Sequence, residues 1–196
     1  MAETRERRWT LDEFLEWSEG KASRYELVNG QPLRMTAGAK RIHDDIVANI
    51  TLDLGPQVIN PGCRSFAGDG AVQPVSGQIG RSDSAVDCGR CPTKAFEAQT
   101  PRAGGEVLAP STRDVDIREK LENYKSVATL KHIGVVEPDS SFVSLWSRET
   151  GVVCSEPRIQ NFGERVRRPG VGADVAMRAF YTGVAFLSET HLVVST

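Results

Sequence analysis

Apolar residues recur at helical spacing along residues 41–57. The positions that would share one helix face are Ile42, Ile46, Ile50 and Leu54. This pattern predicts an amphipathic helix with a buried stripe. His43 lies near the start of the predicted helix, where we favour a surface or capping role over a catalytic one.

A shorter helix is predicted near the N-terminus. Thr10 and Glu13 have the spacing of a capping box, in which each side chain bonds the backbone N–H of the other residue. The helix should run from Leu11 to about Ser18 and stop at Gly20.

A β-hairpin is predicted over residues 25–35. Its Asn-Gly dipeptide at 29–30 stands between two alternating runs, which is a strong signal for a two-residue turn. Tyr25 and Leu27 would share one face of the hairpin, so Glu26 would lie on the other face.

Alternating or short apolar runs predict further strands along the chain. These are Cys63–Ala67, Ala71–Val75, Arg81–Cys88, Ala103–Leu108, His132–Val136, Phe142–Trp146 and Val152–Cys154. The turn at 137–140 predicts that the two strands around it form a hairpin. Residues 158–168 are polar and basic, and the pattern of residues 173–187 assigns no element.

Residues 104–127 combine signals for three successive elements, which we interpret as a strand, a turn at Pro110 and an amphipathic helix. Asp116 with Glu119 has capping-box spacing, and Asp114 is a second candidate cap. One buried stripe of this helix would comprise Ile117, Leu121, Tyr124 and Ala128.

Two charged residues interrupt this pattern. Glu106 stands where a buried strand would carry an apolar residue, and Lys120 lies beside the buried stripe of the helix. Because helical side chains lean toward the helix N-terminus, Lys120 should point toward Glu106. A structural Glu–Lys ion pair would explain both residues, and so would a metal site with a second carboxylate nearby.

Length, net charge and the absence of long apolar runs limit the possible classes of protein, but they do not identify a function. The 196 residues suffice for one domain, which we place at 9–187, between a flexible start at 1–8 and a tail at 188–196. The net charge of −2 means that any nucleic-acid contact must come from a local basic patch. Without a long apolar run or a secretory signal, we expect a cytoplasmic protein with no membrane segment.

The chain has four cysteines, two of which, Cys88 and Cys91, form a lone CxxC motif. A structural zinc site would need a second pair of ligands at similar spacing, and a redox pair is expected at a helix start. We therefore favour ordinary thiols over a zinc or redox centre.

Several segments together resemble a known family over about residues 9–150. They are Arg24–Gly30, the strand at Asp83, Glu106–Thr112, Lys120 with Tyr124, and Val136–Asp139. In this order they resemble the Uma-type restriction endonucleases, a branch of the PD-(D/E)XK nuclease superfamily. The resemblance implies an α/β fold, in which a mixed β-sheet is flanked by helices as in restriction endonucleases.

The resemblance also implies a site that hydrolyses DNA with Mg²⁺ or Mn²⁺. Asp83 and Glu106 would hold the ion, and Lys120 on the helix would replace the lysine usually found on the strand. Glu26 and Tyr124 match further family positions. A carboxylate-bound ion can activate a water molecule, and cutting both strands would suit a homodimer.

Other interpretations remain open at each position. Asp83 could be a turn residue, Glu26 a solvent-facing strand residue and Tyr124 a core residue. The chain could also be an inactive nuclease-fold protein that binds nucleic acid or a protein partner. Two glycines stand at 104–105, where the family carries mainly β-branched apolar residues. They depart from the family pattern, and glycine weakens a central strand.

Overall fold

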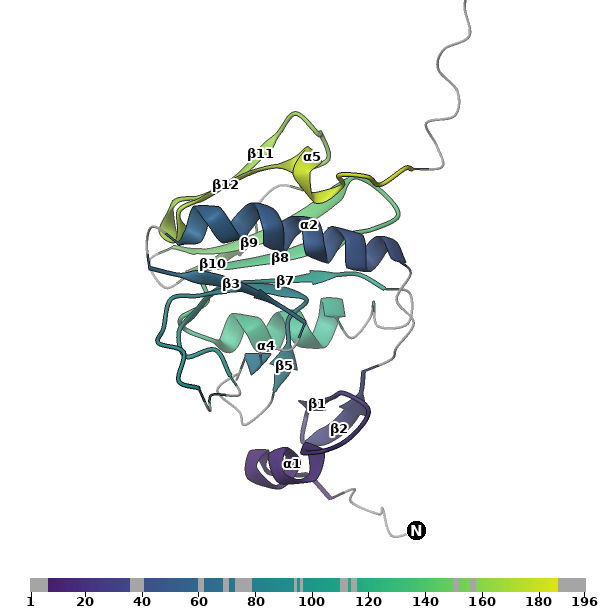
Figure 1. Ribbon diagram of the computed structural model, residues 1–196, viewed down its shortest axis with the longest axis vertical. Coiled ribbons are helices and arrows are strands. Elements are labelled where there is room, and N and C mark those ends of the chain that lie inside the picture. Colours follow the sequence, from purple (N-terminus) through teal and green to yellow (C-terminus); the bar gives the residue numbers. More distant parts are fainter. Residues whose placement is uncertain are drawn as a thin grey trace, which may run out of the picture.

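A computed structural model describes residues 7–186, except 36–40, 60–61, 69–70, 73–78, 94, 96, 110–112, 114–115, 150–151 and 156–157 (Figure 1). Several predicted features therefore lie outside the described residues. These are the turn at Pro110, the cap Asp114, the end of the strand at 73–75, and most of both terminal segments. None of the helices in the described ranges is long and apolar enough to cross a membrane.

The centre of the fold is a six-stranded mixed sheet in the order β10-β9-β8-β7-β6-β3. Its strands are β3 (Arg64–Ala67), β6 (Ser84–Asp87), β7 (Pro101–Val107), β8 (His132–Glu137), β9 (Phe142–Glu149) and β10 (Val152–Ser155). Only β7 and β8 run parallel in this sheet, and the helical segment that connects them crosses one face. The predicted mixed sheet and the hairpin of β8 with β9 are confirmed.

Helices cover both faces of the sheet (Figure 1). On one face, α2 (Arg41–Val58) buries Ile46 and Ile50 as the pattern predicted. The same core includes the C-terminal elements β11 (Arg165–Arg168), β12 (Ala173–Ala176) and α5 (Met177–Phe180), with η2 (Pro169–Val171) between the strands. Residues 165–180 therefore complete the core, although their sequence pattern assigned no element.

The opposite face is covered by η1 (Asp116–Lys120), a π-helical turn, and α4 (Leu121–Ser126). Leu121 and Tyr124 are buried as predicted, but Ile117 is 37% exposed and Ala128 is exposed. The predicted four-residue stripe is therefore wrong at both ends. A π-helical turn advances the chain less per residue than an α-helix, which rotates Ile117 away from the core, and the helix ends before Ala128.

The N-terminal elements form a small layer beneath α4 (Figure 1). Helix α1 (Leu11–Ser18) has the predicted capping box between Thr10 and Glu13. Strands β1 (Tyr25–Val28) and β2 (Gln31–Arg34) form the predicted hairpin. Both turn residues have positive φ, 52° at Asn29 and 75° at Gly30, as a type I′ turn requires.

A second two-stranded sheet, β4 (Ala71–Val72) with β5 (Gly80–Arg81), joins this layer to the main sheet. A bridge between Leu27 and Ile79 links it to the hairpin. The strand predicted over residues 81–88 is interrupted between β5 and β6. There the side chains of Ser82 and Asp83 bond the backbone of β7, which competes with regular pairing.

The structure corrects the expectation for the cysteines. Cys63 and Cys88 form a disulfide across β3 and β6, and Cys91 is an exposed free thiol. Because Cys88 is bonded to Cys63, the CxxC motif does not form a metal site. The pairing of two residues 25 positions apart follows from the register of the two strands, in which Arg64 faces Asp87.

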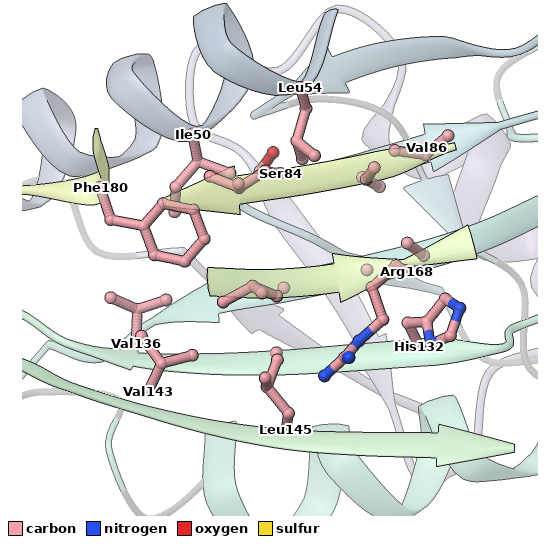
Figure 2. Close-up of a pocket in the computed structure, with 18 of the residues that line it drawn as sticks. Ile50, Leu54, Ser84, Val86, His132, Val136, Val143, Leu145, Arg168 and Phe180 are labelled. Atoms are coloured by element: carbon pink, nitrogen blue, oxygen red, sulfur yellow. The ribbon is translucent and has the colours of Figure 1, made fainter. Parts of the chain in front are cut away.

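An apolar cavity of about 90 Å³ lies between α2, the sheet and the C-terminal strands (Figure 2). Ile50, Leu54, Leu145 and Phe180 are among the side chains around it. Gly105 and Gly134 also line it, and they are register partners on β7 and β8. The two missing side chains therefore contribute to the empty volume.

We expect Gly105→Val to stabilise the protein by roughly 1 kcal/mol, because it restricts the unfolded chain and places methyl groups beside the cavity. A Cβ at this position would lie 3.4 Å from the Gly134 carbonyl oxygen and 3.8 Å from that of Ser84, which are ordinary contacts. Urea unfolding followed by circular dichroism measures the change.

Gly89→Ala is the matched control. A Cβ at Gly89 would lie 2.7 Å from Gln99 Cβ and 2.9 Å from the Thr100 amide nitrogen, so this substitution should destabilise. A lower unfolding midpoint for Gly105→Val would contradict the prediction. It would show that β7 and β8 need glycine for their close packing.

Candidate active site

A buried lysine connects two buried glutamates between the sheet and the N-terminal hairpin. Lys120 ends η1, Glu106 lies on β7 and Glu26 lies on β1. The lysine Nζ is 3.3 Å from Glu106 Oε2 and 3.2 Å from Glu26 Oε1. The side chains of both glutamates are 3% exposed and that of Lys120 is 9% exposed. The predicted direction of Lys120 toward Glu106 is confirmed.

Tyr124 fixes the other oxygen of Glu106. Its hydroxyl donates a hydrogen bond to Glu106 Oε1, while its ring packs with Leu121 and Leu130 in the core beneath the sheet. Burial raises the pKa of the Tyr124 hydroxyl well above its usual value, and the negative charge of Glu106 raises this pKa further. Tyr124 is therefore both a core residue and a neutral hydrogen-bond donor to the carboxylate.

Glu26 is not solvent-facing, so that interpretation is wrong. The residue is 2% exposed, and its Oε1 accepts a hydrogen bond of 2.7 Å from the backbone N–H of Arg81. The sequence showed that Glu26 faces away from Tyr25. It did not show that β5 and η1 cover this second face of the hairpin.

Asp83 lies in the bend that precedes β6. Its Oδ2 accepts a hydrogen bond of 2.8 Å from the backbone N–H of Val107, the residue after Glu106. Nearby, the Gly105 N–H donates to Ser82 Oγ at 3.0 Å. These two bonds hold the bend against β7 on both sides of Glu106, and the Ser82 hydroxyl also donates a hydrogen bond to the Gly105 carbonyl oxygen.

His43 lies beside Asp83 at the candidate site, a contact that the sequence did not predict. Its Nε2 lies 3.2 Å from Asp83 Oδ2 and its Nδ1 lies 3.3 Å from Asp44 Oδ1. The His43 side chain is 15% exposed, so the ring is largely covered rather than free at the surface. Hydrogen bonding to Asp83 raises the pKa of the imidazole, although burial acts in the opposite direction.

The local sequence gave a weak signal for this contact. The apolar stripe of α2 faces the sheet, and His43 is the neighbour of Ile42 in the first turn of that helix. The first turn of α2 therefore reaches the end of β7. A polar residue in this turn should therefore contact a group near the end of β7. The sequence did not identify that group, because Asp83 is 40 residues away along the chain.

The donor types at this site suit a divalent cation. Asp83 and Glu106 belong to neighbouring segments of the sheet and supply the hard carboxylate oxygens that Mg²⁺ and Mn²⁺ prefer. In the described part of the chain, no three His, Cys, Asp or Glu side chains already form a metal cluster. Mg²⁺ usually keeps several waters and takes one or two carboxylates, so two donors are sufficient.

Comparison with solved structures supports the fold. A crystal structure described as "a putative nuclease belonging to DUF820", from Anabaena variabilis, superposes with a TM-score of 0.71 and 16% sequence identity. The match covers 90% of this chain and 99% of that chain. The two chains therefore share one fold over nearly their whole length, and the predicted single-domain α/β architecture with a mixed sheet is confirmed.

Comparison with curated proteins gives no match. The Uma2 family model, described as "Putative restriction endonuclease", matches residues 11–178. This span extends further toward the C-terminus than the resemblance seen in the sequence, and it includes every candidate site residue. A nuclease-like function follows at this coarse level, and the chain belongs to the Uma2 family of restriction-endonuclease-like proteins.

Proposed function

We propose that the protein is a metal-dependent endonuclease that hydrolyses phosphodiester bonds of DNA with water activated by Mg²⁺ or Mn²⁺. The observation that carries this proposal is the pair of carboxylates at the end of β7. Glu106 is buried against a lysine, and Asp83 is bonded to the amide of the next residue. A structural ion pair alone would not require the second carboxylate.

Asp83 and Glu106 are the residues that would hold the ion. When bound, the ion polarises the phosphodiester and lowers the pKa of a water ligand. Tyr124 holds Glu106 Oε1 as a neutral donor, so this carboxylate keeps one defined orientation. The amide of Val107 does the same for Asp83. Both carboxylates are thus positioned by the fold before an ion arrives.

Lys120 is suited to stabilise negative charge. Its ammonium group lies between Glu106 and Glu26, so Glu26 helps to hold it at the site. A buried cation close to the reacting phosphate would stabilise the charge that develops in the transition state. We assign Glu26 a positioning role, because the bonds it makes are to Lys120 and to the amide of Arg81.

DNA is the substrate that the family assignment supports. With a net charge of −2, the protein has no overall attraction for a polyanion, so local arginines must contact the phosphates. Cleavage of both strands of a duplex would require two sites, and we propose a homodimer for that reason. The cytoplasmic location remains a prediction.

One observation favours a second candidate, an inactive nuclease-fold protein that binds nucleic acid or a protein partner. Lys120 already supplies Glu106 with a positively charged partner in the absence of an ion, although it shares this charge with Glu26. A member of the family that had lost catalysis would keep this ion pair for its structural value. Metal binding and cleavage distinguish the two candidates.

The test measures Mg²⁺ and Mn²⁺ binding by calorimetry and nicking of supercoiled plasmid DNA. We expect wild-type protein to bind the ion and nick the plasmid only when it is present. Glu106→Gln should lower cleavage on the order of a hundredfold or more. Glu122→Gln, an exposed glutamate on α4, is the matched control and should behave as wild type.

Wild-type protein that binds neither ion and leaves the plasmid intact would favour the inactive scaffold. Circular dichroism of Glu106→Gln must show a folded protein, because the variant removes a charge that faces Lys120. A folded Glu106→Gln protein with wild-type cleavage would remove Glu106 from the active site.

A further inference from the structure

We propose that His43 is a third ligand of the catalytic ion, and that the site therefore selects a transition-metal cation such as Mn²⁺ over Mg²⁺. This inference rests on the proposed function, because Asp83 is the ligand beside His43. His43 comes from the first turn of α2, whereas Asp83 precedes β6 and Glu106 lies on β7. Three separate elements would thus contribute one donor each.

The distance between the two side chains suits two ligands of one ion. His43 Nε2 is 3.2 Å from Asp83 Oδ2. Two adjacent ligands of an octahedral ion with bonds of about 2.1 Å are separated by about 3.0 Å. The imidazole nitrogen and the carboxylate oxygen therefore need little movement to bind the same cation.

The second ring nitrogen of His43 has the partner that metal-bound histidines usually have. Nδ1 lies 3.3 Å from Asp44 Oδ1. Histidines that bind metals commonly donate the other ring N–H to a carboxylate, which fixes the tautomer and orients the ring. In this structure Nε2–H donates a hydrogen bond to Asp83, because a carboxylate can only accept. When the ring proton is instead on Nδ1 and directed to Asp44, the lone pair of Nε2 can bind a cation that takes the place of this hydrogen bond.

Exposure of the two residues also fits an ion that enters from solvent. The side chains of His43 and Asp83 are 15% and 19% exposed, whereas those of Glu106 and Lys120 are almost fully buried. The two donors near the surface could bind a hydrated ion first. The deeper Glu106 would then complete the set of ligands.

The imidazole determines which cation is favoured. Mg²⁺ binds oxygen ligands and gives up water reluctantly, whereas transition metals bind imidazole nitrogen more strongly. Mn²⁺ accepts carboxylate oxygens as well, so a site with two carboxylates and one imidazole suits it better than it suits Mg²⁺. A site with carboxylates alone would show less discrimination.

Mn²⁺ binding is measured by the loss of the electron paramagnetic resonance signal of the free hydrated ion, and Mg²⁺ is then added as a competitor. The variants are His43→Gln, which keeps a polar group of similar size, and Asp83→Asn. His132→Gln is the matched control, because His132 is a half-buried histidine on β8 that contacts Ser147. We expect His43→Gln to weaken Mn²⁺ binding by about tenfold or more and to change Mg²⁺ binding much less.

A second measurement detects binding of the His43 imidazole to the ion directly. Its decisive result comes from the wild-type protein, so it does not depend on the folding of a variant. Pulsed electron paramagnetic resonance of the wild-type Mn²⁺ complex detects the nuclear spin of a coordinated imidazole nitrogen. We expect this nitrogen signal in the wild type and in His132→Gln, and its loss in His43→Gln. Absence of the nitrogen signal from the wild-type complex would overturn the inference.

The outcomes separate this inference from the proposed function. If Asp83→Asn loses Mn²⁺ binding while His43→Gln binds as well as wild type or more tightly, His43 is only a hydrogen-bond partner of Asp83. The proposed function would then stand without the third ligand. If wild-type protein binds neither Mn²⁺ nor Mg²⁺, both the inference and the proposed function are overturned.

Discussion

Replacing Lys120 by methionine is expected to lower the free energy of unfolding of the metal-free protein by about 3–5 kcal/mol. Lys120 Nζ lies 3.2 Å from Glu26 and 3.3 Å from Glu106, and both carboxylates are buried. Without the lysine, two buried acidic groups would face one another with no cation between them. Losing one partner of a buried ion pair costs more than the intact pair contributes.

The same substitution separates a structural lysine from a catalytic one. Added Mn²⁺ should restore part of the lost stability, because an ion bound by Glu106 replaces the missing positive charge and stabilises the folded state by mass action. Cleavage of plasmid DNA should nevertheless stay about a hundredfold or more below wild type, because the charge on the reacting phosphate loses its buried cation. Thermal melting with and without Mn²⁺, beside the nicking assay, measures both effects.

Lys125→Met provides the matched control. Lys125 lies on the next turn of the same helical segment, but its partner Glu122 is exposed and its ammonium group lies 5.8 Å from the centre of the Trp146 ring, so we expect its loss to cost only about 1 kcal/mol. This variant should retain most of the stability and the wild-type activity. A folded Lys120→Met protein that nicks plasmid at the wild-type rate would exclude Lys120 from the reaction.

The local elements of this fold could be predicted because each depends on residues close in sequence. The capping box of Thr10 with Glu13 determines the start of α1, and the Asn29-Gly30 turn determines the register of the first hairpin. The apolar stripe of α2 and the hairpin of β8 with β9 depend on periodicity alone. These features need no knowledge of distant partners.

The elements over residues 165–180 could not be predicted, because they are short and depend on the main core. Strands β11 and β12 have four residues each, and α5 has four. Val166, Val175 and Phe180 are buried against α2 and the sheet. So short a segment has no periodicity that distinguishes a strand from a helix turn, and tertiary packing decides its conformation.

The candidate site was predicted only in part, because some of its contacts join residues close in sequence and others join residues far apart. Glu106 and Lys120 are 14 residues apart, and the helix that carries Lys120 follows the strand directly, so their meeting could be inferred. The contact of His43 with Asp83 joins residues 40 apart in different elements. The burial of Glu26 depends on how the hairpin packs against η1 and β5, which the alternation within the hairpin does not determine.

The disulfide between Cys63 and Cys88 is the other large determinant of stability that the sequence did not indicate. It closes a segment of 25 residues and joins the edge strand β3 to β6. We expect the double variant Cys63→Ser, Cys88→Ser to lower the free energy of unfolding by roughly 3 kcal/mol, because the unfolded chain regains the conformational entropy of the open loop. Urea unfolding of both proteins measures this loss.

Catalytic function should not change with this bond. Asp83 precedes β6 and Cys88 follows it, so the disulfide and the proposed metal ligand lie at opposite ends of that strand. β3 also pairs with β6 through a backbone ladder and through the ion pair of Arg64 with the buried Asp87, 2.5 Å between nitrogen and oxygen, and these contacts should persist without the disulfide. Mn²⁺ affinity of the folded double variant should therefore equal that of wild type.

Reductant distinguishes this bond from an incidental contact of two thiols. A reducing agent should lower the unfolding midpoint of the wild type to that of the double variant and leave the double variant unchanged. Cys91→Ser, which removes the exposed thiol, is the matched control and should keep the wild-type midpoint in either condition. An unchanged unfolding midpoint of the wild type in reductant would contradict the stabilising role of the disulfide. A lower midpoint would mean that the protein reaches full stability only in an oxidising environment.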